Sequence, residues 1–186
     1  MNPIDRDFAL ALLHEWTQGE GLRKHALAVE AAMRAYARRF GEDEELWGIT
    51  ALLHDFDYER HPAPPDHPLK GHEALAALGV PESIRRAILG HASYTGVPRD
   101  TLMARTLFAV DELCGFLTAC ALVTPGRTLA EVEVDSVKKK MKSKGFARSV
   151  NREEIVQGAE DLGVPLDEHI EFVRDAMRGV AGPLGL

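Results

Sequence analysis

The chain has 186 residues, 45% of them apolar, and one domain of ordinary size accounts for this length. Its formal net charge of −7 disfavours a general binder of nucleic acid or anionic membranes, and a charged fraction of 27% argues against disorder. Only two cysteines accompany eight histidines, which argues against a disulfide scaffold and against a cysteine-liganded zinc knuckle.

The N-terminal segment, Met1–Asp7, lacks the basic start and the long apolar stretch of a signal peptide. The longest uncharged run, Leu113–Gly126, is too short for a membrane-spanning helix, which needs about 18 to 20 apolar residues. We therefore expect a soluble, cytoplasmic protein that does not bind membranes. Cys114 and Cys120 lie six residues apart in an apolar helical stretch, a poor geometry for a disulfide, and are predicted to be buried free thiols.

Helical periodicity dominates the chain, which predicts an all-α fold and a single domain over residues 1–186. An apolar stripe from Leu22 to Phe40 predicts the first helix, with Gly41 able to end it. The acidic residues 42–45 then charge the first turn of a second helix that ends near His54. Prolines between residues 62 and 68 predict a loop, and further helices are predicted at 68–78, 82–91, 99–121, 128–142, 152–161 and 167–179.

Six histidine and aspartate side chains fall on apolar faces, at helix ends or beside the proline-rich loop. Each one alone is as well explained by a hydrogen-bonded core histidine or a surface carboxylate, because a buried polar group needs a partner. Together, four imidazoles and two carboxylates indicate a divalent metal site with nitrogen and oxygen ligands. The candidate ligands are His25, His54, Asp55, His67, His91 and Asp111.

The other four histidines are interpreted differently. His72 lies only five residues after His67 and is the alternative to it as a ligand. His14, His61 and His169 are predicted to face solvent or to lie at the rim of the site.

The order His25, His54-Asp55, Asp111 resembles the signature of the HD-domain superfamily of metal-dependent phosphohydrolases, and the likeness covers residues 20–120. The segment 67–71 resembles the His-Pro-x-x-Gly element of members with two metals, and 91–96 resembles the histidine element that follows it. The C-terminal segments 136–142 and 167–172 are similar to a group of small predicted HD hydrolases whose substrate is not assigned.

This resemblance implies an HD-domain-like helical bundle with a metal-binding core at 20–120 and a C-terminal helical extension at 121–186. It also implies a binuclear site that binds one or two divalent ions, chosen from Fe, Mn, Co, Ni, Mg and Zn. One ion would be held by His25, His54, Asp55 and Asp111, and the other by His67 and His91 with Asp55 bridging. Many relatives follow the His-Asp pair with Gly-Lys, whose lysine meets phosphate, whereas this chain has Phe56-Asp57-Tyr58.

The implied activity is hydrolysis of a phosphoester, such as a nucleotide or dinucleotide, by a metal-activated hydroxide, with Asp55 as the catalytic residue. The expected partner is a small phosphorylated molecule, with no stable binding of nucleic acid. Two alternatives stay open: a di-iron oxygenase on the same scaffold, or a non-catalytic ligand-sensing domain.

Basic residues near the site are the candidates for the missing phosphate contact. Residues 138–148 carry six positive charges and no acid, which is typical of a solvated helix face or of a patch that collects phosphate. Lys139 and Lys140 are the candidates from this segment, and Lys70, one turn beyond His67, is a third.

Overall fold

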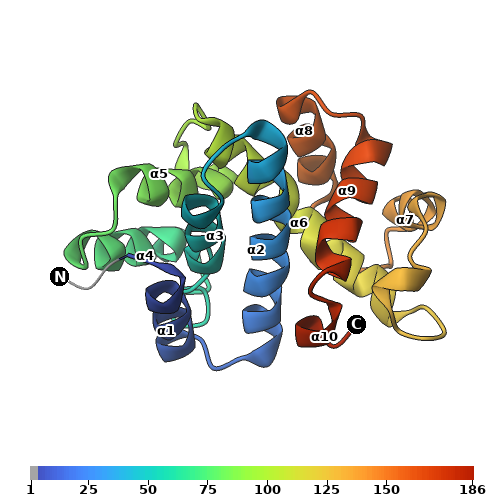
Figure 1. Cartoon of the computed structure of the whole chain (residues 1–186), viewed down its shortest axis with the longest axis horizontal. Helices are drawn as coiled ribbons and strands as arrows, with labels where there is room; N and C mark the ends of the chain where they lie inside the picture. Colours follow the sequence, from blue (N-terminus) through green and yellow to red (C-terminus); the bar gives the residue numbers. More distant parts are fainter. Residues whose placement is uncertain (1–3) are drawn as a thin grey trace.

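The computed structural model describes residues 4–186, and this part of the chain is helical with no strand (Figure 1). The prediction of an all-α fold is confirmed. Residues 1–3, on which the interpretation of the N-terminus partly depends, lie outside the described part. Within residues 4–186, no helix is both long and apolar enough to cross a membrane.

The helices follow one another with short connections. In chain order they are α1 (Arg6–Trp16), α2 (Glu20–Phe40), α3 (Glu44–Leu53), α4 (Asp66–Ala77), α5 (Glu82–His91), α6 (Leu102–Leu122), α7 (Val134–Met141), α8 (Arg152–Leu162), α9 (Leu166–Arg178) and α10 (Ala181–Leu184). Two 3₁₀ turns, η1 (Ser93–Thr95) and η2 (Leu129–Glu131), follow α5 and α6.

The boundary between α2 and α3 combines the glycine stop that the sequence indicated with a side-chain cap. Gly41 adopts a left-handed conformation with φ 71°, which glycine tolerates without a steric cost, and ends α2. The Asp43 side chain then accepts hydrogen bonds from the backbone N–H groups of Glu45 and Leu46 and begins α3. The two helices therefore form an antiparallel pair, and α3 packs along α2.

Two helices lie outside the predicted set. Helix α1 begins at the N-cap Asp5, whose carboxylate accepts from the Phe8 N–H, and it packs against α3 through Ala9, Leu12 and Leu13. The short α10 follows α9 near the C-terminus.

The predicted helix at 128–142 is wrong in its first half. This segment forms η2 and an extended connection at Val132, and helix α7 begins only at Val134. Side chains from α9 take the carbonyl groups that a continuous helix would use: Arg178 donates to the carbonyls of Leu129 and Ala130, and Arg174 donates to that of Val132. These tertiary contacts replace helical hydrogen bonds, so local periodicity could not predict the break.

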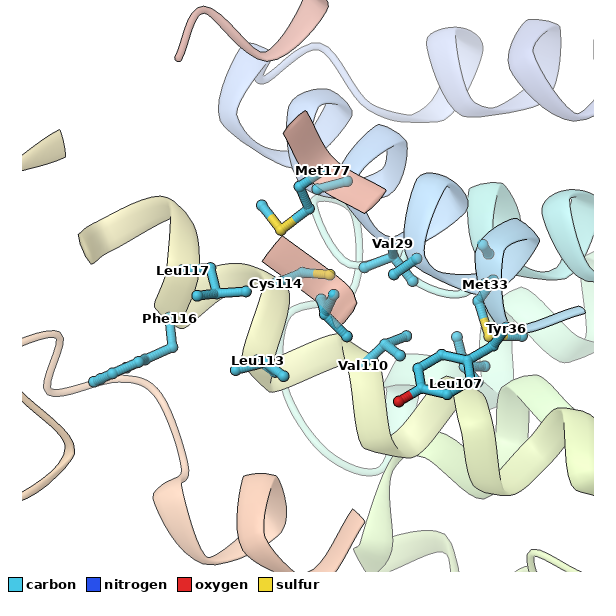
Figure 2. Close-up of a cluster of buried hydrophobic side chains, with 14 of the residues drawn as sticks. Val29, Met33, Tyr36, Leu107, Val110, Leu113, Cys114, Phe116, Leu117 and Met177 are labelled. Atoms are coloured by element: carbon cyan, nitrogen blue, oxygen red, sulfur yellow. The ribbon is translucent and has the colours of Figure 1, made fainter. Parts of the chain in front are cut away.

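The largest apolar cluster lies where α2, α6 and α9 meet (Figure 2). Val29 and Met33 of α2 and Met177 of α9 pack against a row of α6 side chains that includes Val110 and Leu117. Burying each such side chain contributes about 1.5–3 kcal/mol. The prediction for Cys114 and Cys120 is confirmed, because both are buried and neither forms a disulfide.

The C-terminal helices belong to the same packing. Helix α8 packs on α6, and α9 packs on both α2 and α6, so the residues after 120 complete the core around the two long helices. The boundary at residue 120 between core and extension stays a prediction.

Candidate metal centre

Helices α2, α3, α5 and α6 contact one another, α4 packs on α5, and together they bring the candidate ligands from five places in the sequence. His25 of α2 and Asp111 of α6 face each other across the contact between these two long helices. The distance from His25 Nε2 to Asp111 Oδ1 is 2.9 Å, and both side chains are about one-fifth exposed. Asp111 is therefore at the edge of the core, with its carboxylate open to the site.

His54 follows the last residue of α3 and is completely buried. Its Nδ1 donates to the Ala51 carbonyl oxygen at 2.7 Å, so Nε2 is the nitrogen that can offer a lone pair to a ligand. That Nε2 lies 3.5 Å from Asp55 Oδ2 and 3.4 Å from Asp111 Oδ1, but no atom of the described residues forms a hydrogen bond with it. A buried nitrogen without a partner is costly, which points to a ligand at this position.

His67 is positioned by its neighbours in the chain. Because it precedes Pro68, its backbone is extended, with ψ 135°, and it interrupts the helical path at the start of α4. Its Nδ1 donates to Asp57 Oδ1 at 2.8 Å, and Asp57 Oδ2 accepts from the Gly71 N–H at 2.9 Å. His67 Nε2 then lies 3.2 Å from Asp55 Oδ1.

The Asp57 carboxylate is fully buried. In the sequence, Asp57 stood out only because many relatives have a Gly-Lys pair in this segment. A Cβ atom at Gly71 would lie 2.7 Å from Asp57 Cγ, so the glycine of the His-Pro-x-x-Gly segment is needed for this close approach. The signal for Asp57 in the sequence was weak: an acidic residue one position after a buried phenylalanine.

His91, the last residue of α5, repeats the arrangement of His54. Its Nδ1 lies within hydrogen-bond distance of the Ile88 carbonyl oxygen, and its Nε2 lies 3.3 Å from Asp55 Oδ1. The centroid of the His91 ring lies 5.3 Å from that of His54 and 5.3 Å from that of His67. Three imidazoles therefore have Nδ1 fixed by an acceptor and Nε2 within 3.5 Å of the Asp55 carboxylate.

The ligand atoms fall into two groups. The first contains atoms of His25, His54, Asp55 and Asp111, and the second contains atoms of Asp55, His67 and His91; within each group they lie within 4.8 Å of one another. Nitrogen and oxygen donors at this spacing, with the opposite nitrogens of three imidazoles held by hydrogen bonds, suit divalent transition metals. The residues therefore fit a metal ion, and the unpartnered Nε2 of His54 is the observation that supports the fit most directly.

The electrostatics of the cluster favour positive charge at its centre. Burial opposes protonation of His54, but the charges of Asp55 and Asp111 outweigh it and raise its pKa. For His67, burial is likewise outweighed by hydrogen bonds to Asp55 and Asp57, which raise the pKa to about 9. Burial favours neutral carboxyls, yet the charge of His54 helps to hold the pKa of both Asp55 and Asp111 well below the usual range. Protons on the imidazoles compensate the carboxylates, and a bound cation would displace them.

A cavity of about 310 Å³ opens over the ligands, and we call it the metal cavity. Tyr58 and Tyr94 lie in its wall with much of each ring exposed, and the Tyr94 hydroxyl donates to the His67 carbonyl oxygen at 2.6 Å. Two carboxylates that the sequence did not single out, Glu112 and Glu154, also line it. Burial and the charge of Asp111 raise the pKa of Glu112 to about 7.

The three candidate lysines do not reach this cavity. Lys70 is exposed and pairs with Glu73 at 3.1 Å. Lys140 contacts Ser136, and Lys139 lines a different cavity beside acidic residues of α7 and α9. Figure 1 shows α7 at the end of the molecule away from α4 and α5. The structure does not bring the basic segment to the ligands.

The four remaining histidines differ in burial and in hydrogen-bond partners. His14 is exposed and His61 is half-buried, as expected for solvent-facing or rim residues. His72 is not in either ligand group; its Nε2 lies 3.2 Å from Arg85 Nη1. The prediction for His169 is wrong, because this ring is completely buried between α2 and α6. Its Nε2–H donates to the Ala109 carbonyl at 2.9 Å, and its Nδ1 accepts from the Tyr36 hydroxyl at 2.7 Å.

The comparison with protein families supports a family assignment. A family model described as "HD domain" covers residues 22–114, half of the chain, and this range contains all six candidate ligands. The searches of curated proteins and of solved structures gave no match.

Proposed function

The chain belongs to the HD domain family, and from this premise we propose that it is a metal-dependent phosphohydrolase acting on a small phosphoester. The observation that carries the proposal is the sharing of Asp55 between two groups of ligand atoms. A carboxylate placed between two groups can bridge two ions, the arrangement that suits hydrolysis of a phosphoester.

His25, His54, Asp55 and Asp111 would hold one ion, and Asp55, His67 and His91 would hold the other. When bound, the ions would activate water for attack and neutralise charge on the phosphoryl oxygens.

The chain's own groups prepare the site for this chemistry. The carbonyls of Ala51 and Ile88 fix the Nδ1 protons of His54 and His91, so each ring is held with the lone pair of Nε2 facing the centre. Asp57 does the same for His67. Fixed orientation reduces the reorganisation that metal and substrate binding would otherwise require.

The rest of the metal cavity supports substrate binding. Tyr58 and Tyr94 offer aromatic surface at its mouth, and Ser93 donates to Glu154 at 3.0 Å, which fixes that carboxylate in the wall. A nucleotide, a substrate expected from the resemblance, has a base that stacks on such rings.

The test is an activity screen on the whole chain. The protein is stripped with a chelator, reloaded separately with Mn, Fe, Co, Ni, Mg or Zn, and assayed for hydrolysis of nucleotides, dinucleotides and simple phosphomonoesters. The products measured are phosphate from the monoesters and mononucleotide from the dinucleotides. Hydrolysis by the reloaded wild type, absent in the Asp55→Ala variant, would support the proposal. Metal-loaded protein that hydrolyses none of the panel would refute it, and oxygen consumption with one of these compounds would favour the di-iron oxygenase.

A further inference from the structure

A second cavity of about 380 Å³ lies between α2, α6 and α10, and we call it the side cavity. His25 and Gly115 line both the side cavity and the metal cavity, so the two adjoin at the contact between α2 and α6. The size of the side cavity is in the range of small-molecule sites. Its position beside a ligand histidine makes it an extension of the candidate site.

Two glycines in the side-cavity wall leave space that the protein does not fill. Gly115 lies within the long helix α6, where glycine is about 1 kcal/mol less favourable than alanine. A Cβ atom there would meet no heavy atom within 4 Å, and the same is true at Gly21 in the first turn of α2. Neither residue has a positive φ, so backbone conformation does not require glycine at either place. The open volume above them is available to a ligand.

The walls of the two cavities differ in chemistry. The metal cavity is lined mainly by histidines, carboxylates and tyrosines, whereas the side cavity has Leu122 and Leu184 with a single hydroxyl, that of Thr118. Lys24 is the one Lys or Arg side chain among the described residues that line either cavity. Its ammonium lies 3.7 Å from the exposed Glu20 carboxylate, a pair that solvent screens.

We propose that the substrate of the metal centre is an amphipathic phosphoester. Its phosphoryl group lies over the ligand groups, and its apolar organic group passes His25 and Gly115 into the side cavity. Lys24 lines the same cavity and adds a positive charge near the anionic ligand. The acidic metal cavity is lined by no Lys or Arg of the described residues. This inference rests on the proposed phosphohydrolase function and adds the class of its substrate.

Two phosphonates test the inference, since their P–C bond resists hydrolysis and binding can be measured without turnover. Methylphosphonate and hexylphosphonate are titrated by calorimetry into the metal-loaded wild type. Each methylene removed from water is worth about fourfold in affinity. With three or more methylenes in the side cavity, hexylphosphonate should bind about 50-fold more tightly than methylphosphonate.

Variants at the junction locate the effect. Gly115→Phe fills the passage between the cavities and should reduce the preference for hexylphosphonate over methylphosphonate to about twofold or less. Gly115→Ala places only a methyl group in open space and should keep the preference. Gly21→Phe, at another part of the side-cavity wall, tests the same volume if Gly115→Phe does not fold. Gly145→Phe, which lines neither cavity and has open space around its Cβ, is the matched control.

The outcomes separate the inference from the function on which it rests. Equal binding of the two phosphonates by the wild type, or an unchanged preference in both folded phenylalanine variants, would overturn the inference and leave the proposed function intact. If the metal-loaded wild type binds neither phosphonate, the proposed function and the inference both fail.

Discussion

His54 in the metal centre and His169 between α2 and α6 are both completely buried, but their ring nitrogens have different partners. His169 has protein partners at both nitrogens, Tyr36 and the Ala109 carbonyl. His54 has a backbone acceptor at Nδ1, and no residue within 4–186 forms a hydrogen bond with its Nε2. Burial therefore does not distinguish a ligand from a core histidine. The distinguishing property is a fixed Nδ1 together with a free Nε2 that faces carboxylates.

The largest difference between the two rings should appear when metal is added. A metal at about 1,000 times its dissociation constant stabilises a protein by about 4 kcal/mol if only the folded state binds it. We expect wild type and His169→Gln to gain this stability, and His54→Ala to lose most of the gain because a ligand is missing. Urea unfolding with and without metal, together with metal analysis after dialysis, measures the difference. An equal gain in His54→Ala would contradict the assignment of His54 as a ligand.

The second comparison concerns stability without metal. His169→Leu leaves the Tyr36 hydroxyl and the Ala109 carbonyl without their buried partner, which should cost about 2–4 kcal/mol. The loss should be the same in metal-free and metal-loaded protein, because neither partner belongs to the ligand groups. Chemical unfolding of the variant in both states checks this. Tyr36→Phe, which removes one of the two hydrogen bonds, is the matched control and should cost less.

Asp57 extends the comparison to the carboxylate that holds the candidate ligand His67 in place. In Asp57→Asn the side-chain amide can donate to His67 Nδ1, which forces the proton onto Nε2 and removes the lone pair that a metal needs. Loss of such a supporting group typically lowers metal affinity about 10- to 100-fold. A two-site calorimetric titration should show weaker binding at the His67–His91 group only. Equal weakening at both groups, or none, would show that Asp57 does not act through His67.

The smallest expected effect is a pH dependence of the free energy of unfolding of the metal-free protein. This dependence has one sign for His67 in the metal centre and the opposite sign for His169 between α2 and α6. The pKa of His67 is raised to about 9, so its contribution to stability is complete below about pH 6.5 and is lost as the pH rises toward 9. Burial lowers the pKa of His169, so its contribution is complete above about pH 6.5 and falls as the solution becomes more acidic.

Each effect is limited to about 1.4 kcal/mol per pH unit, the value for one proton. Unfolding of wild type, His67→Gln and His169→Gln at about pH 5.5, 7 and 9 measures them as differences from the wild type. The two differences should change with pH in opposite directions, and a common direction would refute the assignment.

The sequence predicted which residues the structure brings together better than it predicted their surroundings. The candidate ligands were singled out because imidazoles and carboxylates on apolar faces are unusual, and the resemblance put them in order. They are His25, His54, Asp55, His67, His91 and Asp111. Asp57 and His169 were missed or misplaced because their partners, Gly71 for one and Tyr36 for the other, become neighbours only in the fold. Lys139 and Lys140 form a conspicuous charge run, but charge alone does not say which face of the molecule a helix occupies.

Secondary structure shows the same limit. Helix α5 has the predicted bounds, since Pro81 and the apolar spacing of Ile84 and Ile88 are local signals. The segment at 128–142 was wrong because two arginines of α9 take its carbonyl groups, and no local pattern contains that information.

The contact of Asp57 with Gly71 has a consequence for how related chains can diverge. A side chain at position 71 collides with the carboxylate at 57, and the carboxylate at 57 fixes the imidazole at 67, so we expect these three positions to vary together. Replacing Asp57 with a smaller residue would free position 71 to vary, whereas keeping Asp57 would require glycine there. Paired substitution at 57 and 71 among descendants would therefore record the loss of this support for His67.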